Sequence, residues 1–250
     1  MNPIVEILVL VCVGFVAGCI NTLAGGGSLL TLPILIFLGL PPNVANGTNR
    51  IAILFQNIFT TAGFKSKGII TFPFSIYLGT SALLGSIIGA QIAVDIKGET
   101  FNKILAIIMI IVVVYMIFQS KSKQQNRIEK TTGKHLWISI VLFFFVGVYG
   151  GFIQAGVGFI MLLILSSVSN LSLVKSNAIK VTVALIYTVS AVAVFAYNDK
   201  INWKVGLTLA IGNSVGGWLA SRWSVKKGDG IIRKFLVVMI LIIAIKLWFF

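Results

Sequence analysis

The sequence predicts an all-α, polytopic membrane protein built from two inverted repeats, each consisting of a glycine-broken, re-entrant-type helical hairpin and three transmembrane helices. Three observations predict this fold. The 250 residues are 58% hydrophobic and only 10% charged, whereas ordinary soluble domains are about 45–50% apolar and about 25% charged. Apolar windows long enough to form membrane helices recur along the chain. Both halves open with apolar segments that glycines interrupt.

The apolar windows approach the roughly 20 residues that a membrane helix needs and leave almost no chain for a soluble domain. The chain starts Met1-Asn2-Pro3 without a cationic region, so a cleaved signal peptide is not expected. The windows are 4–20, 51–64 with its flanks, 72–94, 104–118, 136–149, 181–197, 205–221 and 235–250.

A polar stretch divides the chain into a first membrane repeat, 1–119, a cytoplasmic linker, 120–135, and a second membrane repeat, 136–250. Glycine-interrupted segments open the two halves, at 23–28 and 154–158. Weak internal similarity with interrupted segments in matching places is typical of transporters. The expected counterparts are Gly14 with Gly147, Gly18 with Gly151, Asn21 with Gln154, Arg50 with Lys180 and Gly85 with Gly217.

Lysine and arginine gather in the linker, at 65–67 and at 222–234, and the positive-inside rule places all three in the cytoplasm. Each half then holds three crossings and one opening element, 4–38 or 136–169, that returns to its starting side. A straight helix of about 35 residues would be roughly 50 Å long, against a hydrocarbon core of about 30 Å. A hairpin folded at the glycines is therefore expected, and an odd number of crossings inverts the second half. Four simple crossings per half, with parallel repeats, is the alternative, but it places 222–234 outside.

The run Ala24-Gly25-Gly26-Gly27-Ser28 predicts a break in the first apolar segment. Non-helical backbone inside a membrane is tolerated only where protein or a water-filled cavity covers it. The next half-helix, 28–38, would begin at the break, and the free N–H groups and dipole of a helix N-terminus attract anions. We therefore expect an anion site here. Close helix packing through small residues is the alternative.

Arg50 enters an apolar helix with Asn46, Thr48 and Asn49 just before it. Asn46 is a candidate N-cap. A buried arginine is costly and usually has a partner or a substrate, yet all six acidic residues fall near segment ends. We expect an anionic substrate to supply the missing charge, and snorkelling of Arg50 to the interface is the alternative.

The remaining candidates follow from the same pattern of uncharged polar groups and glycines inside apolar segments. Gln56 and Asn57 lie one to two turns beyond Arg50, where they either line the same path or bond across helices. Asn177 and Lys180 occupy the matching helix of the second half. The complete set of candidate substrate-binding residues is Asn21, Gly25, Gly26, Gly27, Ser28, Asn46, Thr48, Asn49, Arg50, Gln56, Asn57, Gln154, Gly156, Gly158, Asn177 and Lys180.

No catalytic set is present in the sequence, so neither enzymatic activity nor a cofactor or metal is expected. Cys12 and Cys19 lie on one helix face as small packing residues, and His135 stands alone in a basic loop. The net charge of +14 does not indicate a nucleic-acid partner, because the basic residues sit in short gaps between apolar segments. The expected partners are a small anion and the lipid bilayer. The coupling ion and any homo-oligomer are left open.

Three runs resemble the TauE/SafE family of sulfite and sulfonate-related permeases: NTLAGGGSLLTLP at 21–33, LGLPP at 38–42 and ANGTNR at 45–50. The second half is more divergent, and Gln154 and Lys180 match only loosely. The resemblance implies a transporter of small sulfur-containing anions, such as sulfite, thiosulfate, sulfoacetate or other organosulfonates, in a prokaryotic cytoplasmic membrane. We expect alternating access around a midplane site formed by the two glycine breaks. A passive anion channel and a non-transporting membrane subunit of a sulfur-metabolism complex are the alternatives.

Overall fold

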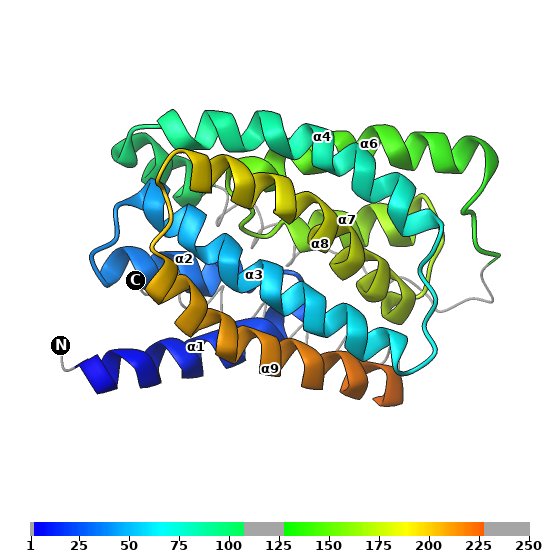
Figure 1. The fold of residues 1–250 in the computed structure, drawn as a ribbon. Helices are drawn as coiled ribbons and strands as arrows, with labels where there is room; N and C mark the ends of the chain where they lie inside the picture. The colour runs from blue at the N-terminus through cyan, green and yellow to red at the C-terminus, as the bar shows by residue number, and fades with distance from the viewer. Residues whose placement is uncertain (1–2, 108–127, 228–250) are drawn as a thin grey trace.

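The computed structural model describes residues 3–107 and 128–227, and these are almost entirely helical (Figure 1). Residues 98–107 also form a helix. The expected crossing at 235–250, most of the crossing at 104–118 and residues 120–127 of the linker lie outside the described residues. The helices are α1 (Pro3–Leu23), α2 (Ser28–Phe37), α3 (Pro42–Lys65), α4 (Phe74–Asp95), α6 (Gly133–Phe152), α7 (Val157–Ser167), α8 (Leu173–Tyr197) and α9 (Trp203–Lys227).

Two pairs of helices are broken where the sequence predicts it. Four residues, 24–27, separate α1 from α2, and four residues, 153–156, separate α6 from α7. Helices α2 and α7 have 10 and 11 residues, which at 1.5 Å per residue is about 15 Å, or half of the hydrocarbon core. The opening element of each half is therefore a helix followed by a half-length helix.

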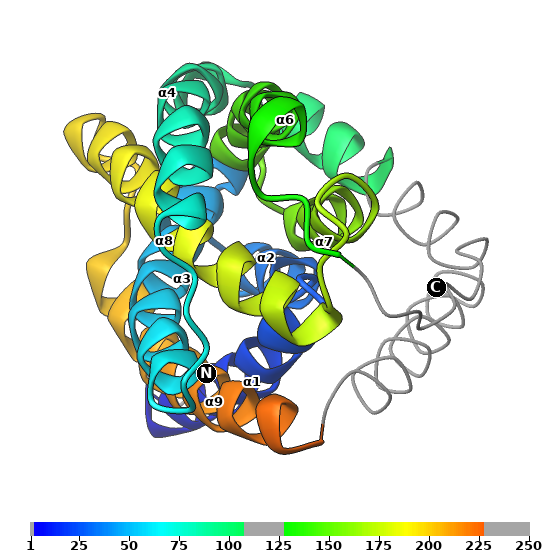
Figure 2. The same ribbon diagram turned by 90° about the vertical axis from the view of Figure 1, so that its right-hand side faces the viewer.

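The helices form two groups whose members come from both halves of the chain. Helix α1 packs along α9, and α6 packs along α4, while α3 packs on α9 and α8 on α4. Figure 1 places α4 and α6 along one edge and α1 and α9 along the other, with α3 and α8 between them, and Figure 2 shows the same order from one end. Each opening helix therefore has its main partner in the other half.

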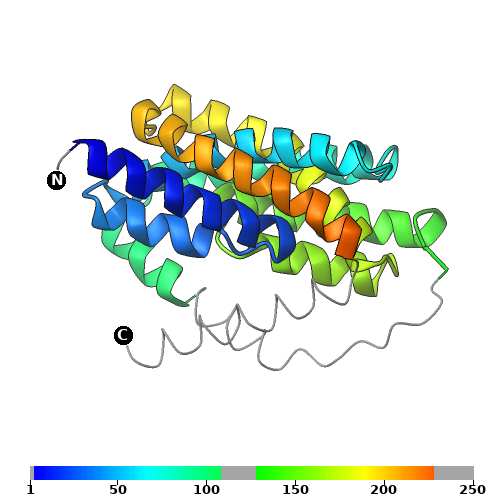
Figure 3. The same cartoon turned by 90° about the horizontal axis from the view of Figure 1, so that it is seen from below.

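Glycines allow the backbones of α1 and α9 to touch, and Figure 3 shows these two helices side by side. A Cβ added at Gly212 would overlap the carbonyl oxygen of Val11, and one at Gly216 would overlap that of Phe15. Because the residue numbers of the contacting pairs rise together along both helices, α1 and α9 are parallel. Small residues at such crossings let helices approach closely in membranes.

The crossing of α4 and α6 has the same construction. Cβ atoms at Gly85 and Gly89 would overlap the carbonyl oxygens of Phe144 and Val148, so these helices are also parallel. Helix α4 follows α3 after a short turn and returns along the bundle (Figure 1). The group of α1, α3 and α9 therefore runs in one direction, and the group of α4, α6 and α8 runs in the other.

Four helices are long and apolar enough to cross a membrane: Ile4–Leu23, Phe74–Asp95, Gly133–Phe152 and Leu173–Tyr197. Their exposed side chains include Leu84 and Phe145, more than half exposed in the middle of α4 and α6, as expected of lipid-facing positions. Helices α3 and α9 are less apolar because they carry buried polar side chains. The protein is therefore an integral, all-helical membrane protein.

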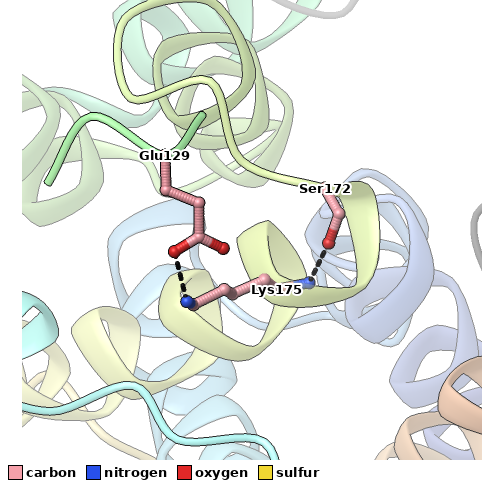
Figure 4. A network of polar contacts seen from close by, with 3 residues as sticks. All are labelled: Glu129, Ser172 and Lys175. Carbon is pink, nitrogen blue, oxygen red and sulfur yellow. Dashed lines mark hydrogen bonds and ion pairs between the residues drawn. The ribbon is translucent and has the colours of Figure 1, made fainter. Parts of the chain in front are cut away.

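The start of α8 carries a side-chain cap and an ion pair. Ser172 caps the helix by accepting from Lys175 N, and Lys175 Nζ donates to Glu129 at 2.6 Å (Figure 4). Both side chains of this ion pair remain partly exposed, at 33% and 42%. Lys175 thus lies at the edge of its segment, in contrast to Lys180 one turn further on.

Candidate functional site

The two helix breaks touch each other. Gly25, in the first break, has a φ of 89° and lies directly against Gly158, at the start of α7. A Cβ added to either residue would overlap backbone atoms of the other. Only glycine fits at this contact, so Gly25, the first of the three consecutive glycines, brings the two breaks together.

Free backbone donors lie in the first break and at the first residue of α2. The N–H groups of Gly26, Gly27 and Ser28 find no acceptor within residues 3–107 and 128–227. Ser28 Oγ accepts from Asn49 Nδ2 at 3.2 Å, and Asn49 Oδ1 in turn accepts from Thr31 Oγ1 at 2.7 Å. Helix α3 thereby fixes the start of α2. The positive end of the α2 dipole lies at the break.

Arg50 is fully buried on α3 and reaches across to the end of α6. Its Nη1 donates to Gly150 O at 2.9 Å, and its Nη2 donates to Gly151 O at 2.6 Å and to Phe152 O at 3.3 Å. Further acceptors are Gln154 Oε1 at 3.1 Å and Asn46 Oδ1 at 3.3 Å. The cation therefore satisfies the last carbonyls of α6, at the negative end of its dipole, and it does not snorkel.

Lys180, buried on α8, does the same for α1. Its Nζ donates to Asn21 O at 2.8 Å, to Thr22 O at 3.0 Å and to Asn177 Oδ1 at 2.6 Å. All three ammonium protons are used. Among the described residues neither cation meets a carboxylate, and oxygen atoms, most of them main-chain, surround both head groups.

An asparagine assists each cation on the same helix. Asn46 Nδ2 donates to Phe152 O, the last carbonyl of α6, at 2.7 Å, and Asn177 Nδ2 donates to Leu23 O, the last carbonyl of α1, at 3.2 Å. The prediction that Asn46 is an N-cap is wrong, because α3 begins at Pro42, one turn earlier. Proline is favoured at the first helical position, and this leaves the Asn46 side chain for the end of α6.

Gln154 and Asn21 occupy different places in their breaks. Gln154 follows the end of α6 with a φ of 65° and accepts from Arg50. Asn21 lies inside the last turn of α1, and its Nδ2 donates to Gln56 Oε1 at 3.1 Å. Gly156, with a φ of 73°, completes the second break. The expected pairing of Asn21 with Gln154 is therefore wrong in position, although both residues belong to the region where the breaks meet.

The other candidates divide into three cases. Gln56 joins α3 to α1, since it also donates to Thr22 Oγ1 at 3.4 Å. Asn57 is fully buried, and neither its Nδ2 nor its Oδ1 has a hydrogen-bond partner in the described part of the chain. Thr48 lies elsewhere, because its Oγ1 accepts from Asn202 N and ties α3 to the start of α9.

Three functional neighbours have no counterpart in the sequence prediction. The ring of Phe195 covers Arg50, with the guanidinium carbon 4.7 Å from the ring centroid. Tyr149 Oη donates to Ala155 O in the second break, and Tyr187 lies fully buried beside Gly150. Tyrosine in the middle of a membrane helix, away from the interfacial belt, is a signal that could have indicated Tyr187, whereas Tyr149 lies in the last turn of α6.

The interior carries two positive charges without a negative one. Within residues 3–107 and 128–227 no aspartate or glutamate is buried, whereas Arg50 and Lys180 are 0% and 3% exposed. Across the same residues, histidine, cysteine and acidic side chains form no group of three or more that could hold a metal ion. An apolar groove of about 840 Å³ between α3 and α9, lined by residues such as Phe55 and Trp218, shares no residue with the candidate set.

Comparison with known proteins identifies the family. The family model for the sulfite exporter TauE/SafE matches residues 10–247. The chain belongs to the TauE/SafE family. This TauE/SafE chain is thus a member of a membrane transporter family, and the residues that resemble the family signature are those that build the first break and the start of α3.

Relatives of this TauE/SafE chain match along nearly their whole length. A probable membrane transporter protein of Haemophilus influenzae is 29% identical over 92% of this chain and 90% of the relative. The probable membrane transporter protein YfcA of Escherichia coli is 26% identical over 96% and 88%, and YunE of Bacillus subtilis is 22% identical over 86% and 87%. No solved structure matches the chain.

Proposed function

We propose that the protein is a permease for small sulfur-containing anions, such as sulfite, thiosulfate or organosulfonates, in the cytoplasmic membrane of a prokaryote. The observation that carries the proposal is the pair of buried cations, Arg50 and Lys180, at the junction of two helix breaks with no buried acid among the described residues. The sulfur chemistry of the substrate rests on membership of the sulfite exporter family.

The charge balance favours an anion over a neutral or cationic substrate. Taking an ion out of water costs several kcal/mol even after the protein relaxes, and a helix C-terminus offsets about 2 kcal/mol at most. The carbonyls replace the water around Arg50 and Lys180 but do not remove the positive charges. A bound anion lowers this electrostatic energy, and a cation raises it.

Four helix ends meet at the proposed site, and they fall into two kinds. The ends of α1 and α6 are occupied by Lys180 and Arg50. The starts of α2 and α7 are the positive dipole ends, and the free N–H groups of Gly26, Gly27 and Ser28 can donate to an oxyanion. In this proposal Asn21, Ser28 and the 25–28 backbone bind the substrate, while Arg50 and Lys180 supply charge.

Alternating access follows from two inverted repeats, which the helix directions and contacts support. Helix α1 runs with the group of α3 and α9, and α6 runs the opposite way with α4 and α8. Each cation crosses from one half to the broken helix of the other. Rocking of one group against the other would expose the junction first on one side of the membrane and then on the other.

Uptake by the purified, reconstituted protein tests the proposal. Proteoliposomes are loaded with buffer and given radiolabelled sulfite or thiosulfate outside, with Arg50→Ala and Gly26→Leu as site variants. A leucine at Gly26 would strike the Phe159 ring, because its Cβ alone would lie 2.7 Å from that ring. Lys175→Met, at the partly exposed start of α8, is the control.

Saturable uptake by the wild type and the control, with loss in both site variants, is the expected result. Equal transport by the site variants would show that the site is wrong. Flux that rises without saturation would indicate a passive channel, and an absence of flux for every sulfur anion would end the permease proposal.

A further inference from the structure

The Tyr187 hydroxyl lies beside Gly150, near the end of α6. Tyr187 is 0% exposed, and its Oη has no hydrogen-bond partner in the described part of the chain. A Cβ added to Gly150 would be only 3.1 Å from the Tyr187 ring and 3.2 Å from Oη. The tyrosine therefore lies against the backbone whose carbonyl receives Arg50 Nη1.

Two more donors lie near this hydroxyl. Arg50 uses both of its terminal nitrogens, yet its buried Nε has no partner among the described residues. Gln154 accepts from Arg50 through Oε1 at 3.1 Å, which leaves the protons of its Nε2 as further donors at this place. The Tyr187 hydroxyl lies near both side chains, and its contact with the Gln154 amide falls outside hydrogen-bond geometry. Buried polar groups are nearly always paired, so unpaired donors in one place call for a ligand.

The first half has an unpaired polar group at the same helical spacing. Tyr187 follows Lys180 by seven residues, and Asn57 follows Arg50 by seven. Seven residues are two turns, so each polar group lies on the same helix face as its cation. Asn57 is likewise fully buried without a partner. A stray unsatisfied group would not be expected at the equivalent place in both halves.

We propose that Tyr187 Oη, Arg50 Nε and Gln154 Nε2 form a donor site for the oxygen atoms of the transported anion, and that Tyr187 is the residue that sets its affinity. The inference rests on the proposed function and adds a ligand to it. Hydroxyl, guanidinium and amide protons are all donors here, and the Arg50 charge has no buried acid to oppose it. This combination fits an oxyanion and disfavours a cation.

Tyr187→Phe tests the inference, since it removes one oxygen and keeps the ring. A hydrogen bond to a charged group corresponds to a change in affinity of about tenfold to a hundredfold. We expect the concentration of thiosulfate or sulfite for half-maximal uptake to rise by that factor. The melting temperature in detergent should stay the same or rise, because the hydroxyl has no hydrogen-bond partner to lose among the described residues. Tyr197→Phe, at the exposed end of the same helix, should change neither quantity.

The outcomes separate this inference from the proposed function. If the wild type transports and Tyr187→Phe keeps its affinity within twofold, Tyr187 does not bind the anion, and the permease proposal stands. A fall in melting temperature without a change in affinity would make the hydroxyl structural and also overturn the inference. If the wild type itself neither binds nor transports the two anions, the proposed function fails first.

Discussion

Arg50 and Gly151 are joined across the two halves of the chain, with 2.6 Å between the guanidinium Nη2 and the glycine carbonyl oxygen. Gly151 also lies against α4, because a Cβ there would overlap the Ser86 carbonyl oxygen. One residue thus fixes the end of α6 to α3 and to α4 together. Any movement that separates α3 from α6 has to break the hydrogen bonds of Arg50.

Arg50→Lys and Arg50→Gln should separate the charge of Arg50 from its geometry. Lysine keeps the charge but has three donors on one atom, whereas Arg50 reaches five acceptors. Carbonyls left unpaired cost about 1–3 kcal/mol each, so both variants should melt at lower temperature than the wild type. Only Arg50→Lys should retain measurable anion uptake. Arg222→Gln is the control, because Arg222 stacks on the Trp218 ring near the end of α9. This variant should change neither the melting temperature nor the uptake by much. Uptake by Arg50→Gln at the wild-type rate would refute the role of the charge.

Two lysines on α8 should differ sharply in their effect on stability. Lys180→Met leaves Asn21 O, Thr22 O and Asn177 Oδ1 without their donor, a loss of about 3 kcal/mol or more. Lys175→Met removes a partly exposed ion pair with Glu129, which corresponds to about 0–1 kcal/mol. Thermal unfolding in detergent measures the difference. Equal melting temperatures for the two variants would mean that Lys180 does not hold the end of α1.

Gly158→Ala should stop transport because there is no room for a methyl group. The added carbon would overlap Gly25, and the breaks would have to separate. Gly39→Ala is the control, since its φ of 94° strains alanine by about 1–2 kcal/mol but nothing lies within 4 Å of the added carbon. We expect Gly39→Ala to lower the melting temperature slightly and to transport normally. Normal uptake by Gly158→Ala would show that the contact of the breaks is dispensable.

Neighbouring residues on α3 should respond in opposite ways. Asn57→Leu replaces a buried amide that has no hydrogen-bond partner among the described residues, so the melting temperature should rise or stay unchanged while anion uptake falls. Gln56→Met leaves Asn21 Nδ2 and Thr22 Oγ1 without a partner, and stability should fall by about 1–3 kcal/mol. Measurement of both quantities for both variants distinguishes binding from structure. An Asn57→Leu protein that is stable and fully active would remove Asn57 from the site.

The sequence predicts the breaks well because glycine is a local signal. Three consecutive glycines at 25–27 and the QAGVG run at 154–158 lie at or beside the points where α1 and α6 end. The partner of Arg50 could not be predicted in the same way. It is a set of main-chain oxygens about 100 residues away, and carbonyls carry no residue-type signal. The positions of the acidic side chains in the sequence therefore do not indicate the partner of Arg50.

The register of the halves is the other point that the sequence leaves undetermined. The predicted pairing of Gly85 with Gly217 is wrong, because Gly85 meets Phe144 and it is Gly212 that meets the corresponding residue, Val11. Glycine-rich apolar helices align almost equally well at several shifts. Helix α1 also continues five residues past Gly18, whereas α6 ends one residue past Gly151. This difference of about one turn explains why Asn21 and Gln154 do not correspond.

The packing of α1 on α9 has a consequence for how the chain is made. At a synthesis rate of about 5–20 residues per second, the roughly 180 residues between the two helices delay α9 by about 9–36 s. Throughout that interval the face of α1 that carries Gly14 and Gly18 lies in the bilayer without α9 packed against it. Release of the ribosome before α9 is complete would leave that face open to other chains. The contact between α1 and α9 can therefore form only late in the synthesis of the chain.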